Sequence, residues 1–326
     1  MSVLRQFKRL AWIVGFALAA AQAAAQERDY PNRPLRLVVG FSAGGTTDFM
    51  ARLLADRMRG PLGQIVIVEN KTSANGAIAA EYVARSEPDG YTLYFTTAGV
   101  AVIYPHLRPA PYDTLRDFAP VSLVAFNSTM LVVNAAMPVK SAVELAAVAR
   151  ANPGRITLAI TALGSVSHLG LALFQAAAGV QFAQVPYRGA APAMTDLLGG
   201  TLNGLFGDGP TVIAQVRAGS IRALAATSKQ RSDIFPDVPT FVEQGFADTV
   251  ADQWAGVLAP ARTPPEIIGR LNAAIAAALN DADVRAKLRE TGTTPASGPA
   301  DDFDRYLHDE YTRWGRIIRE KNIKAE

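Results

Sequence analysis

Short apolar runs alternate with amphipathic segments along the chain beyond its first 25 residues. Arg36–Gly40 and Arg155–Thr161 are two such runs, and a glycine-containing turn follows each of them. The first turn leads into residues 48–59, where apolar side chains recur at helical spacing. Further runs of this kind are Tyr91–Thr97, Gln184–Tyr187 and Leu202–Asp208. The alternation predicts an α/β fold with mixed, largely parallel sheets flanked by helices.

Two longer extended runs indicate that the fold has two lobes. Residues 115–134 form one run and residues 220–227 the other, and we predict that both are crossover strands at a hinge. The predicted domain 1 then consists of residues 26–125 plus 229–326, and domain 2 consists of residues 126–228. Two C-terminal amphipathic stripes would pack on domain 1, with Leu271 and Trp314 among their apolar residues.

Residues 1–25 have the pattern of a secretory signal peptide. Three basic residues precede the apolar run 10–21, and small residues follow it up to Ala25. A membrane anchor is the alternative, but the run is too short for a hydrocarbon core of about 30 Å. We therefore predict cleavage after Ala25 and a protein exported to the periplasm.

Composition narrows the function classes. The predicted signal peptide holds three of the 32 basic residues and none of the 29 acidic ones, so the remaining chain is balanced in charge. That balance does not favour nucleic acid as a partner. The chain has no cysteine and three scattered histidines, which excludes disulfides and thiol nucleophiles and disfavours a metal site. We expect no cofactor.

The turn Phe41–Asp48, FSAGGTTD, is the most informative loop in the sequence. It leaves a predicted strand, carries Gly44 and Gly45, and opens a predicted helix. Glycines allow a ligand to approach the backbone closely, and the free N–H groups of a first helical turn attract anions. The spacing matches neither the phosphate loop nor the dinucleotide fingerprint. A loop that only caps its helix explains the pattern equally well.

A second loop, Thr161–His168, repeats this arrangement in the other predicted lobe. Gly164 gives access to the backbone, and Ser165 supplies a hydroxyl at a helix start. Two such loops would face each other across a cleft at the carboxyl ends of the strands, where open α/β sheets bind ligands. They could share a small anion. Tyr187 and Asp208 end further strands and could contact the rest of a ligand, although Asp208 is equally well explained as an N-cap.

Evidence for catalysis is thin. A Ser165–His168 pair would suit a secreted serine hydrolase, but residues three apart at a helix start are better explained by capping. We expect a binding protein and not an enzyme.

Several longer segments carry a family resemblance. They include YPNRPLRLVVGFSAGGTTD, GSVSHLGLALF, VPYRGAAPAMTDLLGG and IRALAATSKQRSDIFPDVPTFVEQGF, in family order over nearly the whole chain after the signal peptide. The chain resembles the Bug, or TctC-like, extracytoplasmic solute receptors of tripartite tricarboxylate transporters. The resemblance implies a two-lobed periplasmic binding protein, type II-like, with two crossover strands. It also implies a monomer that closes around a small organic carboxylate and delivers it to membrane permease subunits.

The resemblance also implies the ligand-binding residues. In such receptors two glycine-containing loops hold a ligand carboxylate. This role transfers to Phe41, Ser42, Ala43, Gly44, Gly45, Thr46 and Thr47, to Ala162, Leu163, Gly164 and Ser165, and further to Asp48, His168, Tyr187 and Asp208. One departure is that Ser42 and Ala43 stand where the family usually has two prolines. The ligand stays open among di- and tricarboxylates, amino acids and aromatic acids, and a sensor role stays open beside transport.

Overall fold

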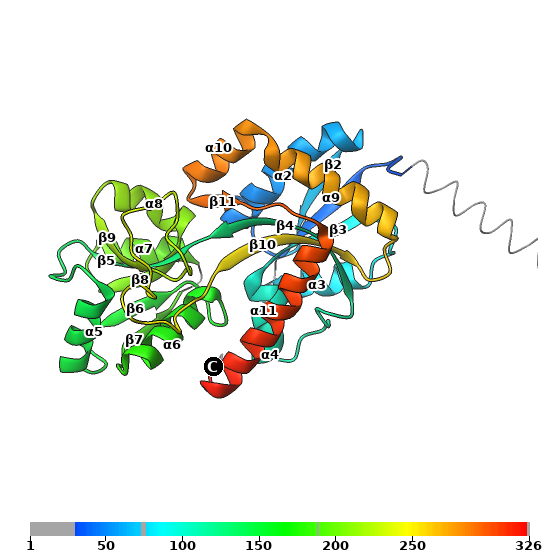
Figure 1. Cartoon of the computed structure of the whole chain (residues 1–326). Coiled ribbons are helices and arrows are strands. Elements are labelled where there is room, and N and C mark those ends of the chain that lie inside the picture. Colours follow the sequence, from blue (N-terminus) through cyan, green and yellow to red (C-terminus); the bar gives the residue numbers. More distant parts are fainter. Residues whose placement is uncertain (1–29, 73–75, 188, 325–326) are drawn as a thin grey trace, which may run out of the picture.

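The computed structural model describes residues 30–72, 76–187 and 189–324. It has two lobes, each built around one β-sheet with helices on both faces (Figure 1). The two-lobed α/β fold expected from the sequence is confirmed. The predicted signal peptide, residues 1–25, lies outside the described residues.

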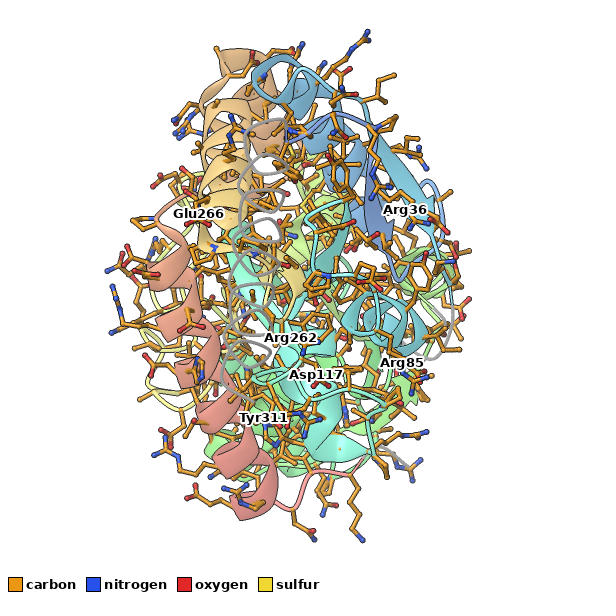
Figure 2. All side chains as sticks on the ribbon, turned by 90° about the vertical axis from the view of Figure 1, so that its right-hand side faces the viewer. Arg36, Arg85, Asp117, Arg262, Glu266 and Tyr311 are labelled. Carbon is orange, nitrogen blue, oxygen red and sulfur yellow. The ribbon has the colours of Figure 1, made fainter. Side chains whose placement is uncertain are left out.

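The first lobe contains a six-stranded sheet in the order β11-β4-β10-β3-β1-β2. Its strands are β1 (Leu35–Val39), β2 (Val66–Asn70), β3 (Thr92–Thr97), β4 (Phe118–Asn127), β10 (Gln253–Pro260) and β11 (Thr293–Pro295). Its helices are α2 (Thr46–Leu62), α3 (Ala77–Ala84), a π-helical turn (Gly99–Ile103), α4 (Tyr104–Leu107), α9 (Pro265–Asn280), α10 (Ala282–Glu290) and α11 (Ala300–Glu320). The two C-terminal stripes pack here as predicted, with Leu271 and Trp314 in the two apolar cores of this lobe. Charged side chains such as Arg85 and Glu266 lie on its outer surface (Figure 2).

The second lobe contains a five-stranded sheet in the order β7-β6-β8-β5-β9. Its strands are β5 (Thr129–Asn134), β6 (Thr157–Ile160), β7 (Ala183–Pro186), β8 (Gly204–Asp208) and β9 (Ile221–Ala226). Its helices are α5 (Ala142–Ala151), α6 (Val166–Ala178), α7 (Ala190–Leu198) and α8 (Gly209–Arg217). Helix α6 joins the two lobes, because Phe174 packs into the core of the second lobe while Val166 and Leu169 pack into a core of the first.

Both sheets are mixed, but parallel pairing does not predominate in them. Strand β1 pairs in parallel with β2 and β3, and β6 pairs in parallel with β7 and β8. The other pairings between the described strands are antiparallel. The difference from the prediction has a physical cause: β4 and β5 carry the chain between the sheets, and β10 brings it back. These strands run against their neighbours.

The first predicted crossover is confirmed, since β4 and β5 are separated only by Ser128. The second differs in detail, because β9 ends in the second sheet and the chain enters the first sheet only at β10. Thr227 connects the two crossings. Its N–H and hydroxyl donate to the carbonyl oxygen of Thr129 at 2.8 and 3.0 Å, and its hydroxyl also reaches the carbonyl oxygen of Ala251 at 2.7 Å.

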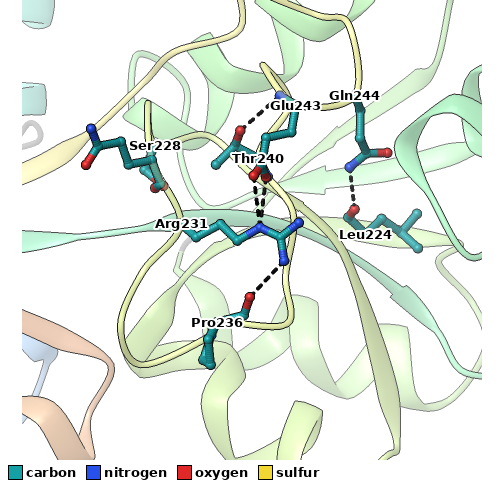
Figure 3. A network of polar contacts seen from close by, with 8 residues as sticks. Leu224, Ser228, Arg231, Pro236, Thr240, Glu243 and Gln244 are labelled. Atoms are coloured by element: carbon teal, nitrogen blue, oxygen red, sulfur yellow. Dashed lines mark hydrogen bonds and ion pairs between the residues drawn. The ribbon is translucent and has the colours of Figure 1, made fainter.

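The segment between the second-lobe strand β9 and β10 covers the second sheet. Phe241 is fully buried in the core of that lobe. Arg231 braces the segment through 3.0 Å contacts to both Glu243 carboxylate oxygens and a 2.9 Å bond to the Pro236 carbonyl oxygen (Figure 3). We expected the return to the first lobe after residue 228, but these residues still pack with the second lobe. The exact domain division stays a prediction.

Candidate ligand-binding cleft

A cavity of about 840 Å³ lies between the two lobes, and a smaller one of about 280 Å³ adjoins it. Both are lined by residues of Phe41–Asp48, which we call loop 1, and of Thr161–His168, which we call loop 2. Residues that line both cavities are Phe41, Ser42, Thr47, Thr161, Ser165, Val166, Gly189 and Gln253. The expected meeting of the two loops at one cleft is therefore present in the structure.

Loop 1 is held by the carboxylate of Asp48. Gly44, at a left-handed φ of 82°, donates its N–H to Asp48 Oδ2 at 2.9 Å. Arg52 Nε donates to the same oxygen and Asn70 Nδ2 to Oδ1, both at 2.9 Å. Asn70 also donates to the carbonyl oxygen of Phe41 at 3.0 Å. Burial alone would raise the pKa of Asp48, but the hydrogen bonds from Arg52, Gly44 and Asn70 outweigh it and lower that pKa.

Loop 2 has the same arrangement with a neutral acceptor. Gly164, at a φ of 75°, donates its N–H to His168 Nδ1 at 3.1 Å. Because a backbone N–H only donates, Nδ1 must be unprotonated and the neutral ring carries its proton on Nε2. Burial lowers the pKa of His168, which favours this neutral form.

Ser165 is the N-cap of α6. Its hydroxyl accepts from the backbone N–H of His168 at 3.3 Å and donates to the carbonyl oxygen of Ala162 at 2.7 Å. The His168 ring instead accepts from Gly164, so the described residues contain no Ser165–His168 nucleophile–base hydrogen bond. The capping interpretation of this pair is confirmed.

Most of the predicted ligand-binding residues line the two cavities. They are Phe41, Ser42, Gly45, Thr46, Thr47, Ala162, Leu163, Gly164, Ser165, Tyr187 and Asp208. Ala43 and Gly44 are exposed and are not part of either lining. Asp48 and His168 are buried behind the loops, where they hold the backbone. In this geometry they position the loops, and their role as ligand contacts stays a prediction.

Tyr187 and Asp208 occupy different parts of the cleft. Tyr187 lines the larger cavity, and its hydroxyl donates to Asp196 at 2.5 Å, a bond that raises the pKa of Tyr187. Asp208 lines the smaller cavity and occupies the N-cap position of α8, but its side chain makes no capping hydrogen bond. The N-cap explanation thus accounts for the backbone of Asp208 and not for its carboxyl group. Burial raises the pKa of this carboxyl group.

Several lining residues were not predicted from the sequence. The first lobe supplies a wall of apolar and polar residues from β3 to the residue after α4, namely Thr97, Gly99, Val100, Tyr104, Leu107 and Arg108. The lobes approach closely here, since a Cβ added to Gly164 would lie 3.1 Å from Leu107 Cδ1. Gln253, the first residue of β10, lines both cavities, and its Oε1 is buried without a hydrogen-bond partner. The only sequence signal for Gln253 was its place before a buried strand.

Two other features bear on the class of site. Within residues 30–72, 76–187 and 189–324 no group of histidine or acidic residues is arranged to hold a metal ion. Among the same residues no helix has the length and apolar character needed to cross a membrane.

Comparison with known proteins gives the family. Residues 50–323 match the model of the tripartite tricarboxylate transporter family receptor. Protein BugT of Bordetella pertussis is 39% identical over 98% of this chain and 99% of its own length. A solved R. palustris protein with adipate is 36% identical with a TM-score of 0.82, over 91% of this chain and 99% of that one. Periplasmic binding protein BugD is 32% identical with a TM-score of 0.80, over 91% and 100%. The chain therefore belongs to the tripartite tricarboxylate transporter receptor family.

Proposed function

We propose that this protein is a periplasmic receptor that binds a small carboxylate in the cavity between its lobes. The observation that carries the proposal is the meeting of loop 1 and loop 2 at one cavity from opposite lobes. Each loop places a glycine with left-handed φ just before a helix N-terminus. The family and the adipate-bound relative support a carboxylate as the ligand class.

The binding groups would be backbone N–H groups and hydroxyls. The first turns of α2 and α6 present N–H groups without partners inside the helix, and helix dipoles favour negative charge at these ends. Ser42 and Thr47 line both cavities and add hydroxyls, whereas the hydroxyl of Ser165 already donates to the carbonyl oxygen of Ala162. Local donors can bind an anion in this way without an excess of basic residues in the chain, which suits the balanced charge of residues 26–326.

Export and delivery complete the proposal. Residues 1–25 would direct the chain to the periplasm and be removed after Ala25. The loaded receptor would then pass its ligand to the membrane subunits of a tripartite tricarboxylate-type permease. The family membership supports this partner class.

Binding can be tested by thermal unfolding and titration calorimetry against a panel of carboxylates. A ligand at a hundred times its Kd should stabilise the fold by about 2.7 kcal/mol through mass action. If no carboxylate in the panel raised the unfolding temperature or gave binding heat, the proposal would be wrong.

A matched pair of variants locates the site. Gly164→Ala places a Cβ at a left-handed φ and 3.1 Å from Leu107 in the cleft. Gly179→Ala places one at a left-handed φ of 62° at the other end of α6, where nothing lies within 4 Å. Each substitution should destabilise the fold by about 1 kcal/mol through backbone strain. Only Gly164→Ala should weaken binding, and equal affinities in the two variants would place the site elsewhere.

A further inference from the structure

The smaller cavity has an unexpected chemistry for a carboxylate site. Its lining includes Asp208, and none of the described residues in that lining is basic, whereas Arg108 lines the larger cavity. Thr129, Ser167 and Thr211 belong to the same lining, and the Thr211 hydroxyl donates to the backbone carbonyl oxygen of Asp208 at 2.8 Å. A second carboxylate of the ligand would meet an acid there, so the lining favours a group with hydrogen-bond donors or positive charge.

Gln253 adds a second acceptor to the smaller cavity. Its Oε1 is buried and has no hydrogen-bond partner in the structure. A buried polar atom of this kind normally has a hydrogen-bond partner. Exchanging the amide oxygen and nitrogen of Gln253 would not supply one, because the nitrogen would then be the unpaired atom. A donor that enters the cavity would satisfy the oxygen.

Strand register places Asp208 and Gln253 beside the same crossover. Asn127 at the end of β4 is the partner of Gln253, and Thr129 at the start of β5 is the partner of Asp208. Only Ser128 separates these two partners, and its carbonyl oxygen accepts the N–H of Gly209 at 3.0 Å. The two acceptors therefore come from different lobes and border one cavity.

We propose that Asp208 and Gln253 recognise a protonated amino group, so that the ligand of this receptor is an amino-substituted carboxylate such as an amino acid. The inference rests on the proposed function. Ser42, Thr47 and Ser165 line both cavities, so a carboxylate bound by them lies next to the space bordered by the two acceptors. An α-amino group is attached one carbon from the carboxylate and has three N–H donors, enough for both acceptors. The rest of the ligand extends along Val100 and the other apolar residues of the larger cavity.

A dicarboxylate without an amino group is the competing ligand, and Asp208 distinguishes the two. A protonated Asp208 could donate a hydrogen bond to a second carboxylate. Burial raises the pKa of Asp208 and so favours this protonated form. Asparagine at this position is neutral and also donates. Asp208→Asn should therefore preserve or improve the binding of a dicarboxylate and weaken the binding of an amino acid.

The experiment is calorimetric titration of the full mature chain, freed of bound ligand, with matched acids. The pairs are aspartate with succinate, glutamate with glutarate, and phenylalanine with 3-phenylpropionate, with both enantiomers of each amino acid. In the wild type, the amino acid of a responding pair should bind at least about tenfold more tightly than its deaminated partner. Asp208→Asn should remove most of this ratio. The control Asp233→Asn makes the same charge change at an exposed residue of the second lobe and should leave the ratio unchanged.

The outcomes separate this inference from the proposed function. If the deaminated acids bind as tightly as the amino acids, or if Asp208→Asn leaves the ratio unchanged, the amino-group site is wrong and the carboxylate receptor stands. If no member of any pair binds but another carboxylate of the panel does, this inference is wrong and the proposed function stands. If no carboxylate of the panel binds, the proposed function is overturned and this inference falls with it.

Discussion

Loop 1 and loop 2 flank the cleft from opposite lobes and share one backbone arrangement. Each follows a strand that pairs in parallel, each has a glycine with left-handed φ, and each enters a helix. In each loop the glycine N–H donates to a side chain four residues later, from Gly44 to Asp48 and from Gly164 to His168. The acceptor is an ionised carboxylate in loop 1 and a neutral imidazole in loop 2.

The difference in acceptor changes how far each loop is tied into its lobe. Asp48 also binds Arg52 and Asn70, so loop 1 is connected to β2 through charge-assisted hydrogen bonds. Loop 2 is held by local neutral bonds. Ser167 accepts the N–H of Thr161 at 2.9 Å and contacts the Ser165 hydroxyl at 2.8 Å. We infer that loop 1 is the more firmly held wall of the cleft and that loop 2 is the first to loosen in acid.

Removing the Asp48 carboxylate should have the largest effect. Asp48→Ala leaves the donors of Gly44 and Asn70 without their acceptor, and we expect a loss of about 2 kcal/mol in unfolding free energy together with weaker ligand binding. The Arg52–Asp48 ion pair adds little to this loss of stability, because the Arg52 side chain is 52% exposed and solvent screens its charge. Urea unfolding measures the loss. Asp56→Ala, an exposed acid on the same helix, should change stability by less than about 0.5 kcal/mol. Equal losses in the two variants would refute the carboxylate brace.

Substitution of His168 should have a smaller effect that depends on pH. At pH 7, His168→Gln should destabilise the fold by about 1 kcal/mol, because one neutral hydrogen bond is lost or weakened. The pKa of His168 is lowered by burial, so the unfolded chain binds more protons than the folded one as the pH falls below the ordinary value of 6.5. The stability that His168 contributes is therefore present above that value and is lost as the pH falls towards its folded pKa.

The effect of His168 on the pH dependence of stability is measured by comparing the wild type with His168→Gln, because other groups also titrate in this range. Burial also lowers the pKa of His106, which adds a slope of the same sign. Burial and the charge of Glu310 raise the pKa of Asp252 to about 6, and its contribution has the opposite sign, being lost as the pH rises through that value. The difference between wild type and His168→Gln, followed by urea unfolding from pH 8 to 5, isolates His168. A difference that does not shrink towards low pH would contradict the neutral-imidazole brace.

The sequence allowed the fold and the two loops to be predicted because their signals are local. Buried strands, glycines and helix starts leave a pattern within a few residues, as in Phe41–Asp48 and Thr161–His168. The N-cap role of Ser165 was predictable for the same reason. The roles of Asp48 and His168 were not, because a polar residue in a first helical turn can point into the cleft or back under its own loop. Burial decides between these, and burial depends on the rest of the lobe.

The parts of the cleft that the sequence did not reveal depend on tertiary register. Gln253 reaches both cavities only because β10 pairs antiparallel with β4 beside the crossover, 126 residues earlier in the chain. The wall from Val100 to Leu107 begins in a π-helical turn, which has no reliable sequence pattern. The chain returns to the first lobe only at β10, because residues 228–252 first cover the second sheet. Phe241 in this segment joins an aromatic cluster with Phe174 and Phe206, a tertiary contact that the local sequence does not reveal.

The smallest effect should come from the hydroxyl at the tip of loop 1. Ser42 and Ala43 are both exposed, but Ser42 lines both cavities and Ala43 lines neither. Ser42→Ala should weaken carboxylate binding about fivefold, the equivalent of one hydrogen bond, and should leave stability unchanged because Gly45 bonds to the Ser42 backbone and not to its side chain. Ala43→Ser should alter neither.

Ser165→Ala removes a hydroxyl from loop 2 and should differ from Ser42→Ala in its effect on stability. The Ser165 hydroxyl already caps α6, so its removal should reduce stability by about 1 kcal/mol as well as weaken binding. Titration with one carboxylate and urea unfolding on the same samples give both quantities. A loss of stability in Ser42→Ala as large as that in Ser165→Ala would mean that the loop 1 hydroxyl also holds its loop, and that the carboxylate of Asp48 does not fix loop 1 by itself.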